Sequence, residues 1–116
     1  MRFVIVGAGR VGTRTTRALA DSGHEVLIIE RDEAAAAIAR EEGFEVVVGD
    51  GAVEGTLVEA GVDTADALAA LTSDLNDNFV ACMIAKQRGC RTVMRVDEGY
   101  REGIYRRYAS EVDEVI

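Results

Sequence analysis

The stretch VIVGAGRVG, residues 4–12, decides the fold. An apolar run typical of a buried parallel strand leads directly into three glycines in the order G-x-G-x-x-G. In such a loop Gly7 permits the tight turn, Gly9 lets a pyrophosphate approach the backbone, and Gly12 lets the next helix pack closely on the strand. The start of that helix offers unpaired N–H groups to an anion. The stretch therefore predicts a phosphate-binding unit, but the glycines alone do not distinguish catalysis from sensing.

The same alternation of strand and helix recurs along all 116 residues. The strands are near-continuous runs of Val, Ile and Leu, which indicates a parallel sheet covered by helices on both faces. We therefore expect a single α/β domain over residues 1–116, a Rossmann-type doubly wound parallel sheet of about six strands. The expected strands are 2–6, 25–29, 45–48, 67–71, 92–96 and 114–116. The expected helices are 10–21, 33–42, 53–60, 76–88 and 100–108.

Composition narrows the class of protein. No apolar run approaches the roughly 20 residues of a membrane span and no signal peptide precedes the first strand, so we expect a cytoplasmic protein without direct membrane insertion. The net charge of −8 argues against a nucleic-acid partner, which would need a basic face. Lys86 is the only lysine among 13 basic residues, and this acidic, lysine-poor composition is typical of proteins adapted to high salt. Cys82 and Cys90 have neither zinc-site nor disulfide-framework spacing, so we expect buried thiols and no metal site.

Acidic residues after the second and third expected strands complete the nucleotide motif. Glu30 lies about 20 residues beyond the glycines, where a carboxylate accepts both hydroxyls of an adenosine ribose and disfavours the 2′-phosphate of NADP. Arg31 beside it partly softens that exclusion. After the third strand, Asp50 is placed to accept a hydrogen bond from an adenine amino group, and Gly51 leaves the ring room. The plain alternative is a turn, because Asp-Gly is a common turn pair.

The segment after the fourth expected strand has two compatible interpretations. Thr72 and Ser73 lie at the carboxyl end of that strand, facing the second half of an extended dinucleotide. Ser73 or Asp74 is also able to cap the following helix. In that helix Phe79 and Met83 fall on one apolar stripe, with Val80 and Ile84, so we expect this stripe to pack into the core.

Taken together, these segments resemble the N-terminal nucleotide-binding domain of the Trk/Ktr potassium-uptake regulators, the RCK family of regulators of K⁺ conductance. The resemblance is carried by VIVGAGRVG, EVLIIERD, VVVGDG, ALTSDLNDN, RTVMRVDEGY and EVDEVI. It implies a regulatory domain that binds NAD(H), or ATP, ADP or AMP, and passes its binding state to a membrane potassium channel or transporter. Family members usually continue into a crossover helix and a C-terminal domain. The sequence is therefore expected to be the N-terminal part of a longer protein or a short stand-alone regulator.

The resemblance also assigns roles to individual residues. It implies contacts with the phosphates for Gly7, Gly9, Arg10, Val11 and Gly12, with the ribose for Glu30, with the adenosine for Arg31, with the adenine for Asp50 and Gly51, and with the distal ribose or phosphate for Thr72 and Ser73. In this family an arginine at the position of Arg10 can serve polyphosphate binding, including contacts across a dimer interface. Arg95 is a weaker candidate. Glu98–Tyr100 departs from the family's more usual asparagine-proline-glutamate-tyrosine run.

An NAD-binding domain excised from an oxidoreductase is the main alternative function. Hydride transfer needs a proton donor or acceptor beside the nicotinamide. The only histidine, His24, opens the second strand at the opposite edge of the sheet, so we expect a structural role for it and no enzyme activity. A methyltransferase is disfavoured because Ile5 occupies the position where an acid usually stands. We expect a homodimer or higher homo-oligomer, from the resemblance and from the apolar residues Ile104, Tyr105 and Tyr108.

Overall fold

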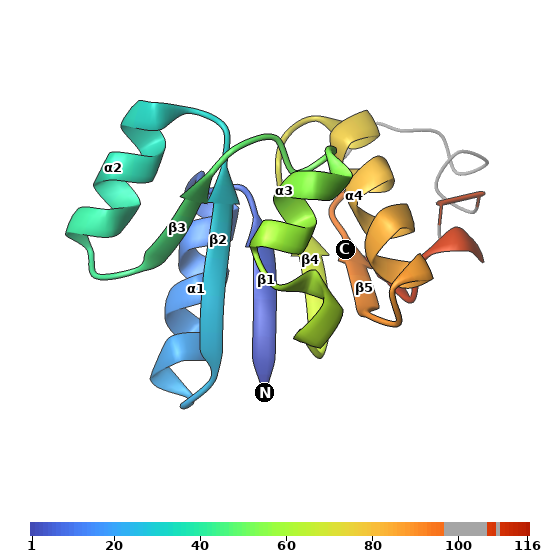
Figure 1. The fold of residues 1–116 in the computed structure, drawn as a ribbon, viewed down its shortest axis with the longest axis horizontal. Coiled ribbons are helices and arrows are strands. Elements are labelled where there is room, and N and C mark those ends of the chain that lie inside the picture. The colour runs from blue at the N-terminus through green and yellow to red at the C-terminus, as the bar shows by residue number, and fades with distance from the viewer. Residues whose placement is uncertain (97–106, 109) are drawn as a thin grey trace.

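The protein forms a six-stranded, all-parallel sheet with helices on both faces (Figure 1). The computed structural model describes residues 1–96, 107, 108 and 110–116. The strand order is β3-β2-β1-β4-β5-β6, so the chain runs outward from β1 in one direction and from β4 in the other. This confirms the expected doubly wound α/β sheet. The strands are β1 (Arg2–Val6), β2 (Glu25–Glu30), β3 (Glu45–Val48), β4 (Ala67–Ala70), β5 (Arg91–Met94) and β6 (Glu114–Val115).

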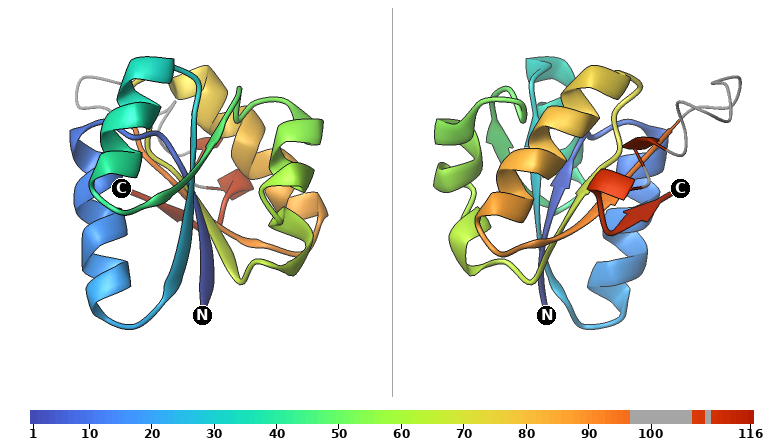
Figure 2. Two further views of the ribbon diagram at one scale, coloured as in Figure 1. Left: turned by 60° about the vertical axis from the view of Figure 1, so that its left-hand side comes forward. Right: turned by 90° about the vertical axis from the view of Figure 1, so that its right-hand side faces the viewer.

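The helices divide between the two faces of the sheet. One apolar cluster joins α1 and α2 to the sheet, and the other joins α3 and α4 to it. Figure 2 shows α1 on the opposite side of the sheet from α3 and α4. Observed and expected bounds agree within one or two residues, which is the usual uncertainty of an element's end. The helices are α1 (Arg10–Asp21), α2 (Glu33–Glu41), α3 (Glu54–Glu59) and α4 (Leu75–Gln87), with a short 3₁₀ helix η1 (Val62–Thr64).

Strand β1 explains why the strand sequences are apolar throughout. Ile5 packs into the cluster under α1 and α2, while Val4 and Val6 pack into the cluster under α3 and α4. Successive side chains point to opposite faces, and both faces are covered, so every position of this strand end is buried. Burying an aliphatic side chain of this size stabilises a fold by about 1.5–3 kcal/mol.

The buried face of α4 differs from the expected one. Phe79, Met83 and Ile84 are only partly buried and pack at the margin of the core. The fully buried face comprises Asn78, Ala81, Cys82 and Ala85. These small side chains let the helix approach β4 and β5 closely, and the larger apolar side chains flank the contact.

Cys82 and Cys90 are free and buried, as expected, and burial raises their pKa values to about 12 and about 11.

The expected helix 100–108 lies largely outside the described residues, as do Ile104, Tyr105 and 98–100. The Tyr108 ring packs edge-on against Phe79 with ring centroids 4.9 Å apart. Within the described residues, no helix has the length and apolar character needed to cross a membrane.

Candidate functional site

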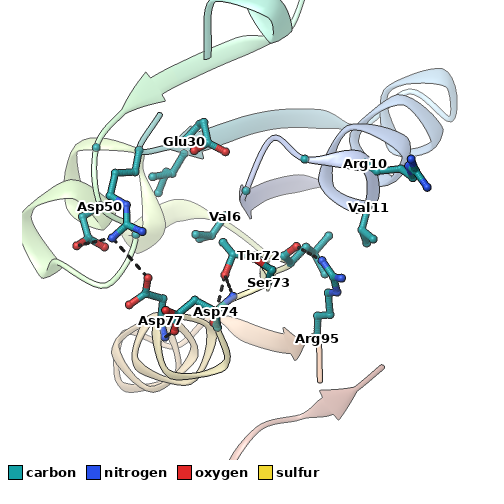
Figure 3. A pocket seen from close by; sticks show the side chains of 17 residues that line it. Val6, Arg10, Val11, Glu30, Asp50, Thr72, Ser73, Asp74, Asp77 and Arg95 are labelled. Carbon is teal, nitrogen blue, oxygen red and sulfur yellow. Dashed lines mark hydrogen bonds and ion pairs between the residues drawn. The ribbon is translucent and has the colours of Figure 1, made fainter. Parts of the chain in front are cut away.

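A cleft of about 710 Å³ opens at the carboxyl ends of the strands, where the strand order reverses between β1 and β4 (Figure 3). Open α/β sheets bind their ligands at such a switch point. Every site residue predicted from the sequence lines this cleft except Gly12, which is buried behind the glycine loop. Asp74, Asp77 and Arg95 also line it. Asp74 and Asp77 were not among the site residues predicted from the sequence.

The three glycines of the loop differ in how strictly the structure requires glycine at their positions. Gly7 has φ +112°, a conformation that favours glycine, and its N–H donates to the Ile29 carbonyl at 2.8 Å. A Cβ on Gly12 would overlap the backbone carbonyl of Gly7, so glycine there lets α1 approach the loop. A Cβ on Gly9 would meet no atom of the described residues within 4 Å. Gly12 is therefore required by packing, whereas the surface over Gly9 is open.

The N-terminus of α1 faces the same cleft. The N-cap is Gly9, which has no side chain to cap the helix, and the first turn carries no acidic residue. The first N–H groups of a helix have no intrahelical partner and carry partial positive charge. Figure 3 shows Arg10 and Arg95 at this end of the cleft, with Asp50 and Asp77 at the other end. The cleft is thus positive near α1 and acidic near β3 and the start of α4.

Glu30 is fixed at the end of β2, beside the glycine loop. One carboxylate oxygen accepts from the Ala8 N–H at 2.8 Å, and the other accepts from the Asp32 N–H at 2.8 Å. A carboxylate oxygen accepts more than one hydrogen bond, so both oxygens retain acceptor capacity for hydroxyl groups. The side chain is therefore held in place while still able to accept from a ligand in the cleft.

Asp50 and Gly51 form a turn that is also part of the cleft. Asp50 Oδ1 accepts from the Ala52 N–H at 2.8 Å, so the turn suggested by the sequence is present, and the contact with an adenine stays a prediction. Gly51 is buried, and a Cβ there would overlap the side chain of Val6. Packing against β1 therefore requires glycine at this position, a reason that the sequence pattern did not reveal.

Asn78 organises the loop between β4 and α4. Its Oδ1 accepts from the Thr72 N–H at 3.1 Å and from the Thr72 hydroxyl at 2.6 Å. Its amide nitrogen donates to the carbonyls of Thr72 and Arg95, at 2.9 and 3.1 Å. The N-cap of α4 is Asp74, not Ser73, and it accepts from the Asp77 N–H. The available sequence signal was an asparagine at the helical spacing of the buried face, three residues before Ala81.

Arg31 and Asp77 connect the two sides of the acidic end. Arg31 Nη1 lies 3.7 Å from Asp77 Oδ2 and 3.9 Å from Asp50 Oδ2. Burial raises the pKa of Asp77, the neighbouring carboxylates of Asp74 and Asp50 raise it further, and the Arg31 guanidinium lowers it. The cleft therefore carries charges of both signs, beside apolar lining residues such as Val6 and Leu71.

The sequence matches a known domain family over nearly its whole length. The TrkA-N domain family matches residues 3–116. The chain belongs to this family. It is 36% identical over 108 residues to a Trk system potassium uptake protein TrkA homologue of Pyrococcus abyssi, covering 90% of this chain and 48% of the relative. It is also 36% identical over 110 residues to the Trk system potassium uptake protein TrkA of Streptomyces coelicolor, covering 92% of this chain and 49% of that relative. The chain thus spans about half the length of these two relatives.

Solved structures share the fold of this TrkA-N domain. The TrkA-N domain of the inner membrane protein ybaL from Escherichia coli superposes with a TM-score of 0.87 at 19% identity, covering 99% of this chain and 85% of that one. The GsuK channel bound to NAD gives a TM-score of 0.81 at 22% identity, covering 99% and 21%. GsuK bound to ADP gives 0.81 at 26% identity, covering 99% and 30%.

The single histidine of this TrkA-N domain lies at the opposite edge of the sheet, just before β2 begins. His24 Nδ1 lies 3.1 Å from the amino group of Met1, and its ring packs edge-on against Phe3. Glu30 is at the other end of β2, so His24 is remote from the cleft. Among the described residues, no group of three His, Cys, Asp or Glu side chains is arranged to hold a metal ion.

Proposed function

We propose that this TrkA-N domain is a nucleotide sensor that binds NAD(H) or an adenine nucleotide and thereby gates potassium transport by a membrane channel or transporter subunit. Its family membership supports the proposal, as do its relatives, which are named potassium uptake proteins. The chain matches only about half of these relatives' length, so the transporter partner is proposed by analogy with them.

The charge distribution of the cleft carries the proposal. The uncapped start of α1, the open backbone at Gly9 and Arg10 make one end suitable for phosphate groups. Glu30, held by two backbone N–H groups beside the glycine loop, is suited to the adenosine ribose. Val11 and Gly12 belong to the helix start that would face the phosphates. A ligand with a phosphate centre and a neutral, hydroxyl-bearing sugar matches this polarity.

NAD(H) is the ligand that best uses the full length of the cleft. Asp50 and Gly51 would contact the adenine, with Arg31 beside the adenosine. Thr72 and Ser73 line the cleft at the end of β4, next to the position for a second ribose or phosphate. Similar structures have been solved with NAD and with ADP, so ATP, ADP and AMP remain competing ligands. The carboxylate of Glu30 disfavours NADP.

The regulatory step would be a population shift. Ligand binding at the carboxyl edge favours one relative orientation of paired domains, in proportion to its differential affinity for the two orientations. We propose that the paired unit is a homodimer or higher homo-oligomer in the cytoplasm, attached to the membrane through its transporter. Tyr108 packs on Phe79 within the chain, so that part of the expected apolar surface is already used internally.

A sensor accounts for the cleft better than an oxidoreductase fragment does. In the described part of the chain, the cleft is lined by neither histidine nor cysteine. The Thr72 hydroxyl in this cleft donates a hydrogen bond to Asn78 Oδ1 and is not directed at a reacting centre. The proposed role therefore needs nucleotide binding without hydride transfer.

Calorimetric titration of the chain with NAD⁺, NADH, NADP⁺, ATP, ADP and AMP in high salt tests this function. We expect binding of NAD(H) or an adenine nucleotide, and much weaker binding of NADP⁺. Failure of all six ligands to bind would overturn the sensor proposal, and tight NADP⁺ binding would overturn the role of Glu30. A monomer in light scattering, at high protein concentration and with ligand present, would contradict the paired arrangement.

A further inference from the structure

Two neighbouring residues at the end of β2 have opposite consequences for ribose recognition. The carboxylate of Glu30 disfavours a 2′-phosphate, whereas an arginine close by is the residue type that accommodates one. Arg31 has that type and position, and its side chain is 67% exposed. An uncompensated guanidinium here would offset the exclusion of a 2′-phosphate by Glu30. The partners of Arg31 therefore matter for nucleotide choice.

Arg31 is paired with acids from two other segments of the cleft. It forms ion pairs with Asp50, in the loop after β3, and with Asp77, in the first turn of α4. Figure 3 shows these two carboxylates at the same end of the cleft. The Asp77 side chain is 24% exposed and the Asp50 side chain 38%, so the pair with Asp77 is the less screened by solvent. Because α4 packs on β4 and β5, Asp77 is also on a rigid element.

The surroundings of Asp77 make this pairing reciprocal. Partial burial and the adjacent carboxylates of Asp74 and Asp50 raise the pKa of Asp77, and Arg31 is the cation that opposes them. Arg31 thus compensates a carboxylate that is otherwise surrounded by like charge. At this end of the cleft Glu30, Asp50 and Asp77 outnumber the single guanidinium.

We propose that Asp77 is a positioning residue for nucleotide specificity. Together with Asp50 it holds the Arg31 guanidinium in ion pairs across the adenosine end, so the charge of Arg31 is compensated and does not recruit a 2′-phosphate. The domain therefore selects nucleotides with an unphosphorylated adenosine ribose, and Glu30 shares this selection with Asp77. The inference rests on the proposed function, since it concerns the same cleft.

Two ligands that differ only in the 2′-phosphate test the inference: 5′-AMP and adenosine 2′,5′-bisphosphate. The measured quantity is the ratio of their dissociation constants, bisphosphate over 5′-AMP, at fixed salt. Asp77→Asn keeps the side-chain shape and removes the charge. We expect it to lower the ratio about two- to fivefold, the effect of releasing one partly exposed ion pair.

Asp74→Asn is the matched control. It removes the same charge from the same cleft, it preserves the N-cap because Asn caps as well as Asp, and neither ion pair of Arg31 involves it. Arg31→Gln in the Asp77→Asn background should restore the higher ratio. Thermal unfolding of each variant verifies that it is folded at the titration temperature.

The possible outcomes separate the two proposals. A ratio that falls in Asp77→Asn, falls less in Asp74→Asn and recovers with Arg31→Gln supports the role of Asp77. An equal fall in both aspartate variants, or no recovery, would overturn it in favour of a general charge effect. Binding of 5′-AMP with an unchanged ratio in Asp77→Asn overturns this inference alone. If the unmodified chain binds neither ligand nor any nucleotide of the six-ligand titration, the proposed function falls with it.

Discussion

The Glu30 carboxylate accepts a hydrogen bond from the backbone N–H of Ala8 at 2.8 Å, which ties the end of β2 to the glycine loop. The residue proposed to bind the ribose therefore also holds the loop proposed to bind the phosphates. Its second oxygen accepts from the Asp32 N–H, at the start of α2. A ligand contacting both elements would meet groups that are already positioned relative to each other, which lowers the ordering cost of binding.

We predict that Glu30→Ala weakens binding of nucleotides with an unphosphorylated ribose by roughly 1–3 kcal/mol, because the hydrogen bonds to the sugar are lost. Glu30→Gln should fall between Ala and the unmodified chain, since its amide nitrogen cannot accept from the second N–H. Calorimetry measures both. Glu25→Ala, at the other end of the same strand, is the control and should bind as the unmodified chain does. Equal affinities of Glu30→Ala and Glu25→Ala would contradict the role of Glu30.

A second prediction separates folding from binding within the glycine loop. Gly12→Ala places a Cβ on the Gly7 carbonyl, so it should lower the free energy of unfolding by about 1–3 kcal/mol, the usual cost of overpacking. Gly9→Ala meets nothing within 4 Å, so it should remain close to the unmodified chain in stability but bind nucleotide more weakly. Urea unfolding and calorimetry measure the two effects. Normal affinity in Gly9→Ala would show that no ligand approaches that backbone.

The sequence was sufficient to predict features that depend on neighbours along the chain. The glycine loop, the acid at Glu30 and the helix that follows the loop are set by short segments whose backbone conformation is local. The strands were found because both faces of the sheet are covered, which makes them continuously apolar. Their carboxyl ends then had to meet at one edge, so the predicted residues converge on one cleft.

The features that the sequence did not reveal depend on contacts between distant segments. Asp77 has a role only because α4 begins opposite the loops after β2 and β3, where Arg31 is located. The contact of Gly51 with Val6 likewise joins two segments far apart in sequence. On α4, the apolar stripe of Phe79 and Met83 was predicted to be the buried face, but the fully buried residues of the helix are smaller ones. Periodicity places residues on a face, but it does not select which of two adjacent faces is buried.

A third prediction concerns Asn78, which is 1% exposed and bonds four groups around the loop after β4. Asn78→Ala leaves buried donors and acceptors without partners and should lower the free energy of unfolding by about 2–4 kcal/mol. Asn76→Ala is the matched control, an exposed asparagine of the same helix, and should change stability by about 0.5 kcal/mol or less. Chemical denaturation measures both, and similar losses in the two variants would contradict the role of Asn78.

The last prediction is a pH dependence at the junction of β5 and β6. The Thr92 backbone N–H donates to the Asp113 carboxylate at 2.8 Å, and with the Thr92 hydroxyl this holds the pKa of Asp113 below its ordinary value. A carboxylate with a depressed pKa stabilises the fold above its unfolded-state value of 3.8, and this contribution is lost as the pH falls through the folded-state pKa. Asp113→Asn should therefore be less stable than the unmodified chain near neutral pH, and the difference should shrink on acidification below about pH 4.

Urea unfolding followed by circular dichroism from pH 7 down to pH 2.5 measures this difference. Comparison of the two chains isolates Asp113 from Asp77, whose raised pKa acts in the opposite sense by favouring the fold at low pH. Thr92→Ser is the control, because it keeps both the hydroxyl and the backbone donor and should retain the pH dependence of the unmodified chain. A stability difference that stays constant with pH would mean that the ionised carboxylate of Asp113 does not hold β6 in place.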